Sequence, residues 1–134
     1  MVVIDASVIS KLFLPLEENR QEAKEILRKH LQEQEEIYVP DLAFYEVANT
    51  LATKTAVPLA KVLKDLNKLD KFNFNVEHSS IDAIGQAAKI AKDNHVSVYD
   101  AVYAVLAQDK GCILITADAK FADQVNLPFV KKLG

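Results

Sequence analysis

The chain has 134 residues, of which 50% are hydrophobic and 26% charged, and its formal net charge at pH 7 is -3. This size and composition predict a globular protein with enough apolar side chains for a core, and without repeat or linker we expect one domain over residues 1–134. The negative charge argues against binding nucleic acid through a basic surface alone. A site whose positive charge comes from a bound metal ion stays open.

The predicted elements alternate between strands and helices along the chain. Short apolar runs predict the strands, and segments with apolar residues every three to four positions predict the helices. In chain order these are a strand at 2–5, a helix starting near Val8, a helix at 19–36, a strand at 37–40, helices at 42–55 and 59–71, a strand at 74–78, helices at 80–93 and 98–109, a strand at 112–116, a short helix at 119–124 and a strand at 129–133. Such alternation predicts an α/β fold with three layers, a central parallel β-sheet flanked by helices.

Local signals refine three of these helices. Asp41 is placed to cap helix 42–55. The apolar face of helix 80–93 includes Ile81 and Ile84, which we expect to be buried. Helix 98–109 is apolar nearly all round, so it should be buried on most sides.

The chain carries one cysteine and no long apolar stretch. Cys112 lies in the apolar run "CILI", where a buried thiol acting as a small hydrophobic group is the expected role. A single cysteine allows no disulfide within the chain, which fits a reducing cytoplasm. No window approaches 18 uncharged apolar residues, and no basic segment precedes an apolar one at the start. We therefore expect a cytoplasmic protein without signal peptide or membrane span.

Four carboxylates stand beside predicted apolar elements. Asp5 ends the first strand, and Asp118 follows the fourth strand by two residues. Asp100 lies at the start of the apolar helix that precedes the fourth strand. Glu46 lies one turn into the helix after the second strand. Because ligands bind at the carboxyl ends of parallel strands, all four can converge at one edge of the sheet.

Helix capping is a structural alternative for three of these acids. Asp5 or Ser7 can cap the helix near Val8, and Asp118 can cap the helix that follows it. Asp100 stands three residues after Ser97, the spacing of a capping box. Glu46 has no such alternative, because it lies outside capping range of the residue that opens its helix. The sequence leaves the choice open for the other three.

Four carboxylates in one place repel one another, which raises their pKa values and gives no stability. A bound divalent cation resolves the conflict, and oxygen-only ligands favour Mg²⁺ or Mn²⁺. The chemistry that needs acid-held Mg²⁺ is chiefly transfer at phosphorus. The three histidines are scattered over helix, strand and loop, so we expect them to be structural or surface residues: His30, His78 and His95.

Other α/β phosphate-binding classes lack support. Dinucleotide-binding and P-loop proteins need a glycine-rich turn after the first strand, and the chain has only Gly85, Gly111 and Gly134. A phosphatase of the haloacid-dehalogenase kind needs a second acid where Ser7 stands. A phospho-acceptor signalling domain needs an acidic pair at the first strand, where Asp5 stands alone.

Four segments stand out when read together: "VIDASVI" at the N-terminus, "FYEVANTL" at 44–51, "VYDAVYAVLA" at 98–107 and "LITADAKF" at 114–121. In this order and near these spacings they resemble the PIN-domain ribonucleases, and most closely the toxin half of VapBC-type toxin–antitoxin pairs. The resemblance spans essentially the full length and implies a PIN-like fold and a metal-dependent endoribonuclease that leaves a 5′-phosphate. The residues that fall on the family's acidic positions, implied to hold Mg²⁺ or Mn²⁺ and to be catalytic, are Asp5, Glu46, Asp100 and Asp118.

The resemblance further implies supporting residues and partners. Ser7 and Thr116 fall on the family's usual hydroxyl positions, where they would orient water or a carboxylate. The implied partners are an RNA substrate, a second copy of the chain in a homodimer, and a small antitoxin protein. A PIN-like domain that binds RNA or protein without cutting is the rival interpretation, and its signature would be a missing acid.

Several lysines are candidates for contacts with RNA. Lys11, Lys54 and Lys120 are expected nearest the acids. Four further lysines, mixed with Asp65 and Asp70, share a face of the helix at 58–72 that is expected to be solvated: Lys61, Lys64, Lys68 and Lys71. Asp123, five residues after Asp118, is expected to be a solvated helix residue.

Overall fold

The computed structural model describes residues 1–134 and contains a five-stranded sheet. The strands are β1 (Val2–Ile4), β2 (Ile37–Pro40), β3 (Asn75–Glu77), β4 (Ile113–Thr116) and β5 (Val130–Lys132). All neighbours pair in parallel, in the order β3-β2-β1-β4-β5. The first strand of the chain is therefore the central one, and Val2 pairs with Ile37 on one side and with Ile113 on the other.

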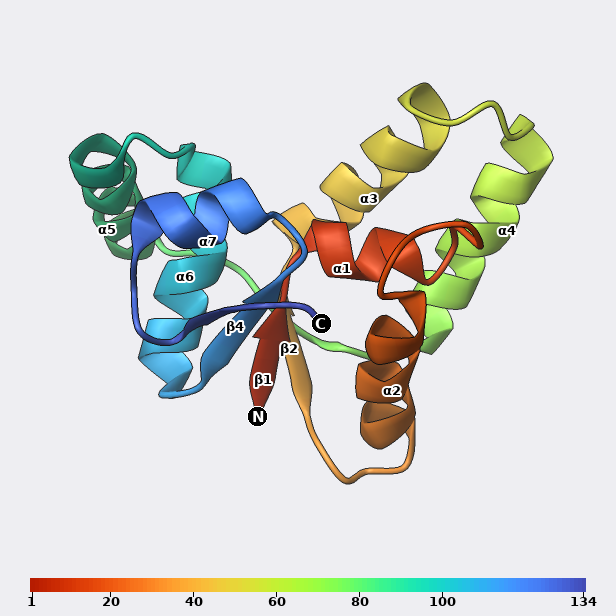
Figure 1. Ribbon diagram of the computed structural model, residues 1–134, viewed down its shortest axis with the longest axis horizontal. Helices are drawn as coiled ribbons and strands as arrows, with labels where there is room; N and C mark the ends of the chain where they lie inside the picture. The colour runs from red at the N-terminus through yellow and green to blue at the C-terminus, as the bar shows by residue number, and fades with distance from the viewer.

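Seven helices cover the sheet in two layers. They are α1 (Ala6–Lys11), α2 (Arg20–Leu31), α3 (Leu42–Thr53), α4 (Leu59–Lys71), α5 (Ile81–Asn94), α6 (Val98–Lys110) and α7 (Ala119–Val125). Figure 1 shows α1 to α4 on one side of the sheet and α5 to α7 on the other. The predicted three-layer α/β fold with a parallel sheet is confirmed. No helix is both long enough and apolar enough to cross a membrane.

The core lies on both faces of the three central strands. Val3, Val39 and Leu114 are completely buried, as expected for strands of a parallel sheet covered on two sides. Helix α6 packs against β1, β2 and β4 and also against α5. Its buried residues surround most of its circumference, as predicted: Ala101, Tyr103, Ala104, Val105 and Ala107.

The predicted cap of α3 is wrong. Asp41 has helical backbone angles (φ -58°, ψ -25°), and its side chain makes no capping hydrogen bond. A capping side chain needs an extended backbone to reach the free N–H groups of the first turn. The Asp41 carboxylate instead lies 3.1 Å from Nδ1 of His78, an exposed side chain. At α5 the cap is regular, since Oγ of Ser80 accepts from the Ala83 N–H at 3.1 Å.

Helix α2 ends at Leu31, five residues before the predicted limit. Glu33 adopts a left-handed conformation (φ 59°), and the N–H groups of Gln34 and Glu35 turn back to the Lys29 carbonyl. Three glutamates in 32–36 would oppose the negative end of the helix dipole, which favours the earlier stop.

Burial differs from the sequence prediction at three places. Ile81 and Ile84 are exposed, and Ala87 is the buried residue of α5. Asp65 is buried rather than solvated, and Lys61 pairs with its carboxylate at 2.6 Å. Cys112 is half-buried against the core, where burial raises the pKa of its thiol.

His30 has a structural role. Its Nδ1 accepts from the Ile37 N–H at 3.1 Å, and its Nε2 lies 3.0 Å from the Phe72 carbonyl oxygen. With Nδ1 as the acceptor, Nε2 carries the proton and donates to that carbonyl. The ring thereby ties the start of β2 to the end of α4. His95 is exposed and caps the end of α5 in a left-handed conformation (φ 56°).

Candidate active site

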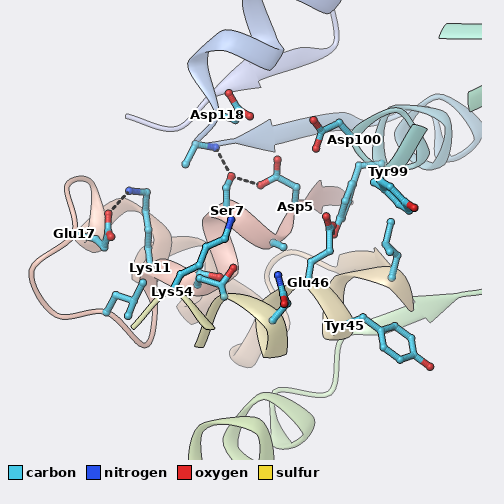
Figure 2. A pocket seen from close by; sticks show the side chains of 18 residues that line it. Asp5, Ser7, Lys11, Glu17, Tyr45, Glu46, Lys54, Tyr99, Asp100 and Asp118 are labelled. Carbon is cyan, nitrogen blue, oxygen red and sulfur yellow. Dashed lines mark hydrogen bonds and ion pairs between the residues drawn. The ribbon is translucent and has the colours of Figure 1, made fainter. Parts of the chain in front are cut away.

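One cavity, with a volume of about 720 Å³, lies at the carboxyl ends of β1 and β4. Five acids line it. Glu17 lies beside Lys11, and the other four come from four different elements: Asp5, Glu46, Asp100 and Asp118. Figure 2 shows their carboxylates around the same opening, with Asp5 in the middle. We call this opening the acidic cavity. The expected convergence at one edge of the sheet is present in the structure.

Asp5 is the most buried of the four acids, with 6% of its surface exposed. It follows β1 directly and caps α1, where its carboxylate accepts from the Val8 N–H at 3.2 Å and from the Ser7 hydroxyl. Burial raises its pKa from the ordinary 3.8 to about 6, against the opposing effect of these hydrogen bonds. The Asp100 charge adds to the increase.

Ser7 and Thr116 connect Asp5 to the end of β4. The Ser7 hydroxyl donates to Asp5 and accepts from the Ala117 N–H at 2.9 Å. Thr116, fully buried, accepts from the Asp118 N–H at 3.0 Å through its Oγ1, which lies 3.5 Å from the Ser7 hydroxyl. The two hydroxyls therefore fix the backbone between β4 and α7 relative to Asp5.

The structure resolves the capping alternatives without excluding a second role. Asp118 caps α7, since one of its carboxylate oxygens accepts from the Phe121 N–H at 3.0 Å. At α6 the cap is Ser97, whose Oγ accepts from the Asp100 N–H at 3.0 Å. Each carboxylate has lone pairs beyond those used in capping, so Asp5, Asp100 and Asp118 keep capacity to bind a ligand in the cavity.

Sequence reasoning missed Tyr103. Its hydroxyl, on the buried face of α6, donates to Oε1 of Glu46 on α3 at 2.6 Å. Burial and this bond raise the pKa of Tyr103 well above its ordinary value, so the hydroxyl keeps its proton and remains a donor. The bond holds one oxygen of Glu46 and leaves the other free. No spacing along the chain reveals a contact between residues 57 positions apart.

The four acids influence one another's pKa values, and Asp100 takes part in each of these interactions. Burial is the main cause of the raised pKa values of Glu46 and Asp100, and repulsion adds to it. The charge of Asp100 acts on Asp5 and Glu46, and the charge of Asp118 acts on Asp100. No lysine or arginine forms an ion pair with any of them. The cluster therefore lacks an internal counter-charge.

The donor set fits a hard divalent cation. Every polar group of the cluster is an oxygen, from carboxylates and hydroxyls, and no cysteine or histidine lines the cavity. No three acidic side chains already stand close enough together to ligate one ion.

The other end of the cavity is less acidic. Lys11 and Lys54 line it, whereas Lys120 and Asp123 do not. The Lys11 ammonium lies 3.4 Å from Glu17, while Lys54 has no ion pair (Figure 2). None of the four lysines on the exposed face of α4 lines the cavity.

Comparison with known proteins identifies the class that this fold and cavity represent. The model of the PIN domain matches residues 2–126, so the chain belongs to the PIN-domain family. The resemblance found in the four sequence segments is confirmed.

Individual relatives agree with this assignment. The chain is 32% identical to Ribonuclease VapC3 of Pyrobaculum aerophilum over 127 residues, which cover 92% of this chain and 93% of the relative. The fold is similar to that of VapC20 of Mycobacterium tuberculosis, described as a sarcin-ricin loop cleaving toxin, with a TM-score of 0.70 and 16% identity over 92% of this chain and 94% of that one. A toxin–antitoxin complex from Klebsiella pneumoniae gives a TM-score of 0.70 and 20% identity over 97% and 95%.

Proposed function

We propose that this protein is an endoribonuclease that depends on Mg²⁺ or Mn²⁺ and acts as the toxin of a toxin–antitoxin pair. The observation that carries the proposal is the acidic cavity, in which four carboxylates from separate elements gather and none of them forms an ion pair with a lysine or arginine. Such an arrangement has no value for stability, because burial and repulsion both disfavour the charged forms. A relative that shares 32% of the sequence carries the name ribonuclease, which supports the same reading.

The proposed ligands of the ion are Asp5, Glu46, Asp100 and Asp118. A divalent ion held by these residues would supply the chemistry of water activation and of charge stabilisation at phosphorus. Ser7 and Thr116 hold Asp5 and the β4–α7 junction in fixed relation through their hydrogen bonds. Tyr103 holds one oxygen of Glu46 and so fixes the direction of the other.

The test uses cellular RNA incubated with purified protein in Mn²⁺ or in EDTA, followed by mapping of new 5′-phosphate ends. We expect new 5′-phosphate ends with the wild type in Mn²⁺, and none in EDTA or with Asp100→Asn. Asp70→Asn is the matched control, because Asp70 is exposed on α4 and does not line the cavity. Equal cleavage by wild type and Asp100→Asn would contradict the proposal. Mn²⁺ binding without any cleavage would favour the non-catalytic binding module.

We also propose an antitoxin partner and a homodimer. The support for the partner is the fold shared with a protein from Klebsiella pneumoniae that is described in a toxin–antitoxin complex. An antitoxin can block the acidic cavity by placing a basic side chain among the acids, where it would supply the missing positive charge. Light scattering of the protein alone, and with the product of a neighbouring small reading frame, measures both assemblies.

A further inference from the structure

Two tyrosines on the rim of the acidic cavity are exposed to solvent. Tyr45 on α3 has 72% of its surface exposed and Tyr99 on α6 has 63%, and both line the cavity. Each comes directly before an acid of the cavity, Glu46 or Asp100. In Figure 2 both rings lie on the side of the cavity away from Lys11 and Lys54.

Folding does not account for the exposure of these two rings. The chain has four tyrosines, and the other two are engaged by the protein itself. Tyr103 is 1% exposed and bonded to Glu46. Tyr38 is half-buried, with the Lys110 ammonium 4.7 Å from its ring centre. Exposed tyrosine therefore occurs only where the cavity opens, and a large exposed apolar surface beside a polar site is typical of ligand contact.

The electrostatics of the cavity favour a ligand contact that does not depend on charge. Four unpaired carboxylates repel the phosphates of RNA, and the whole chain carries a net charge of -3. Lys54 is the only lysine of the cavity without an ion pair. Stacking of a base on an aromatic ring is nearly independent of charge and of base identity, because every base has a flat face.

We propose that Tyr45 and Tyr99 stack on unpaired nucleobases next to the phosphate that enters the acidic cavity. Bases in a duplex are already stacked on their neighbours and cannot reach a ring, so a loop or an open end is required. The inference rests on the proposed function for the position of the phosphate. It goes beyond that function by naming the residues that hold the flanking nucleotides.

The absence of tryptophan from the chain allows a direct test. Tyr45→Trp and Tyr99→Trp each place the only tryptophan of the chain on the rim. Both variants are titrated, in EDTA and again in Ca²⁺, with three oligonucleotides of equal length: an unstructured RNA, an abasic ribose-phosphate chain and an RNA duplex. We expect quenching by the unstructured RNA only. Ile81→Trp is the control, because Ile81 is 84% exposed on α5 and does not line the cavity.

Affinity measurements complete the test. Tyr45→Ala and Tyr99→Ala should each weaken binding of the unstructured RNA about tenfold, while Tyr45→Phe and Tyr99→Phe keep it. Binding of the abasic chain should stay unchanged in all four variants. Two results would overturn the proposal. One is equal quenching by the unstructured RNA and the abasic chain, and the other is an affinity of the alanine variants for the unstructured RNA equal to that of the wild type. Tryptophan emission of the Tyr45→Trp or Tyr99→Trp variant that changes with protein concentration in the absence of RNA would also overturn it, because a second copy of the chain would then cover the rings.

The outcomes separate this inference from the proposed function. Quenching by unstructured RNA in a protein that cuts no RNA in Mn²⁺ would keep the stacking and reject the nuclease. Cleavage by wild type, together with an unchanged KM in both alanine variants, would keep the nuclease and reject the stacking.

Discussion

Asp5→Asn should stabilise the protein at neutral pH in the absence of metal while abolishing the proposed activity. The asparagine can keep both local hydrogen bonds, since its side-chain oxygen accepts from the Val8 N–H and the Ser7 hydroxyl as Asp5 does. What it removes is a buried negative charge. The wild-type chain tolerates this charge because, in our proposal, a divalent ion compensates it.

The magnitude follows from the pKa of Asp5, which burial raises from 3.8 to about 6. The folded protein holds this proton more tightly than the unfolded chain, so stability is highest below pH 4 and is lost as the pH rises to about 6. Above that the ionised carboxylate costs about 3 kcal/mol, and at pH 4.5 about 1 kcal/mol. We expect Asp5→Asn to recover up to about 3 kcal/mol at pH 7.5 and much less at pH 4.5.

Urea unfolding in EDTA at the two pH values measures the difference. Asp70→Asn, on the exposed face of α4, should show no gain at either pH. Millimolar Mn²⁺ should raise the unfolding free energy of the wild type and leave that of Asp5→Asn unchanged. A variant less stable than wild type at pH 7.5, or a gain equal at both pH values, would refute the reasoning.

Three further predictions address separate parts of the molecule. Tyr103→Phe keeps the buried ring but removes the donor to Glu46, and we expect about tenfold weaker Mn²⁺ binding by calorimetry; unchanged affinity would count against the positioning role. Lys54→Ala should lower the slope of log K against log salt for RNA binding by about 0.7, and Lys11→Ala by less because Lys11 is already ion-paired. Equal effects would contradict this ranking. Ser80→Ala should cost about 1 kcal/mol of stability in thermal unfolding, through loss of the α5 cap.

The sequence predicts the features of this protein that depend on local pattern. The alternation of apolar runs and helical periodicity gives all five strands and the parallel sheet, because each element buries a face that its own residues define. The four acids are foreseen as a group because Asp5, Asp100 and Asp118 stand beside the ends of apolar elements and Glu46 lies one turn into the helix after β2. The acids meet because the carboxyl ends of parallel strands lie at the same edge of the sheet.

Features that depend on distant neighbours could not be predicted. The apolar stripe on α5 suggested that Ile81 and Ile84 are buried, but α6 meets this helix along the face of Ala87. Asp41 fits a cap by spacing, yet its carboxylate lies 3.1 Å from Nδ1 of His78, the residue that directly follows β3. In both cases the deciding partner comes from another part of the chain.

The order of the strands has a consequence for protein synthesis. β1 leaves the ribosome first, but its neighbour β4 begins only at Ile113. Until that strand has emerged, Asp5 stands at the edge of an incomplete sheet, and Ser7 has no Ala117 N–H to bind. A nascent or prematurely terminated chain therefore contains three of the four acids without the scaffold that gathers them. The nuclease proposed here would therefore have its four acids together only after β4 and the turn into α7 have been made.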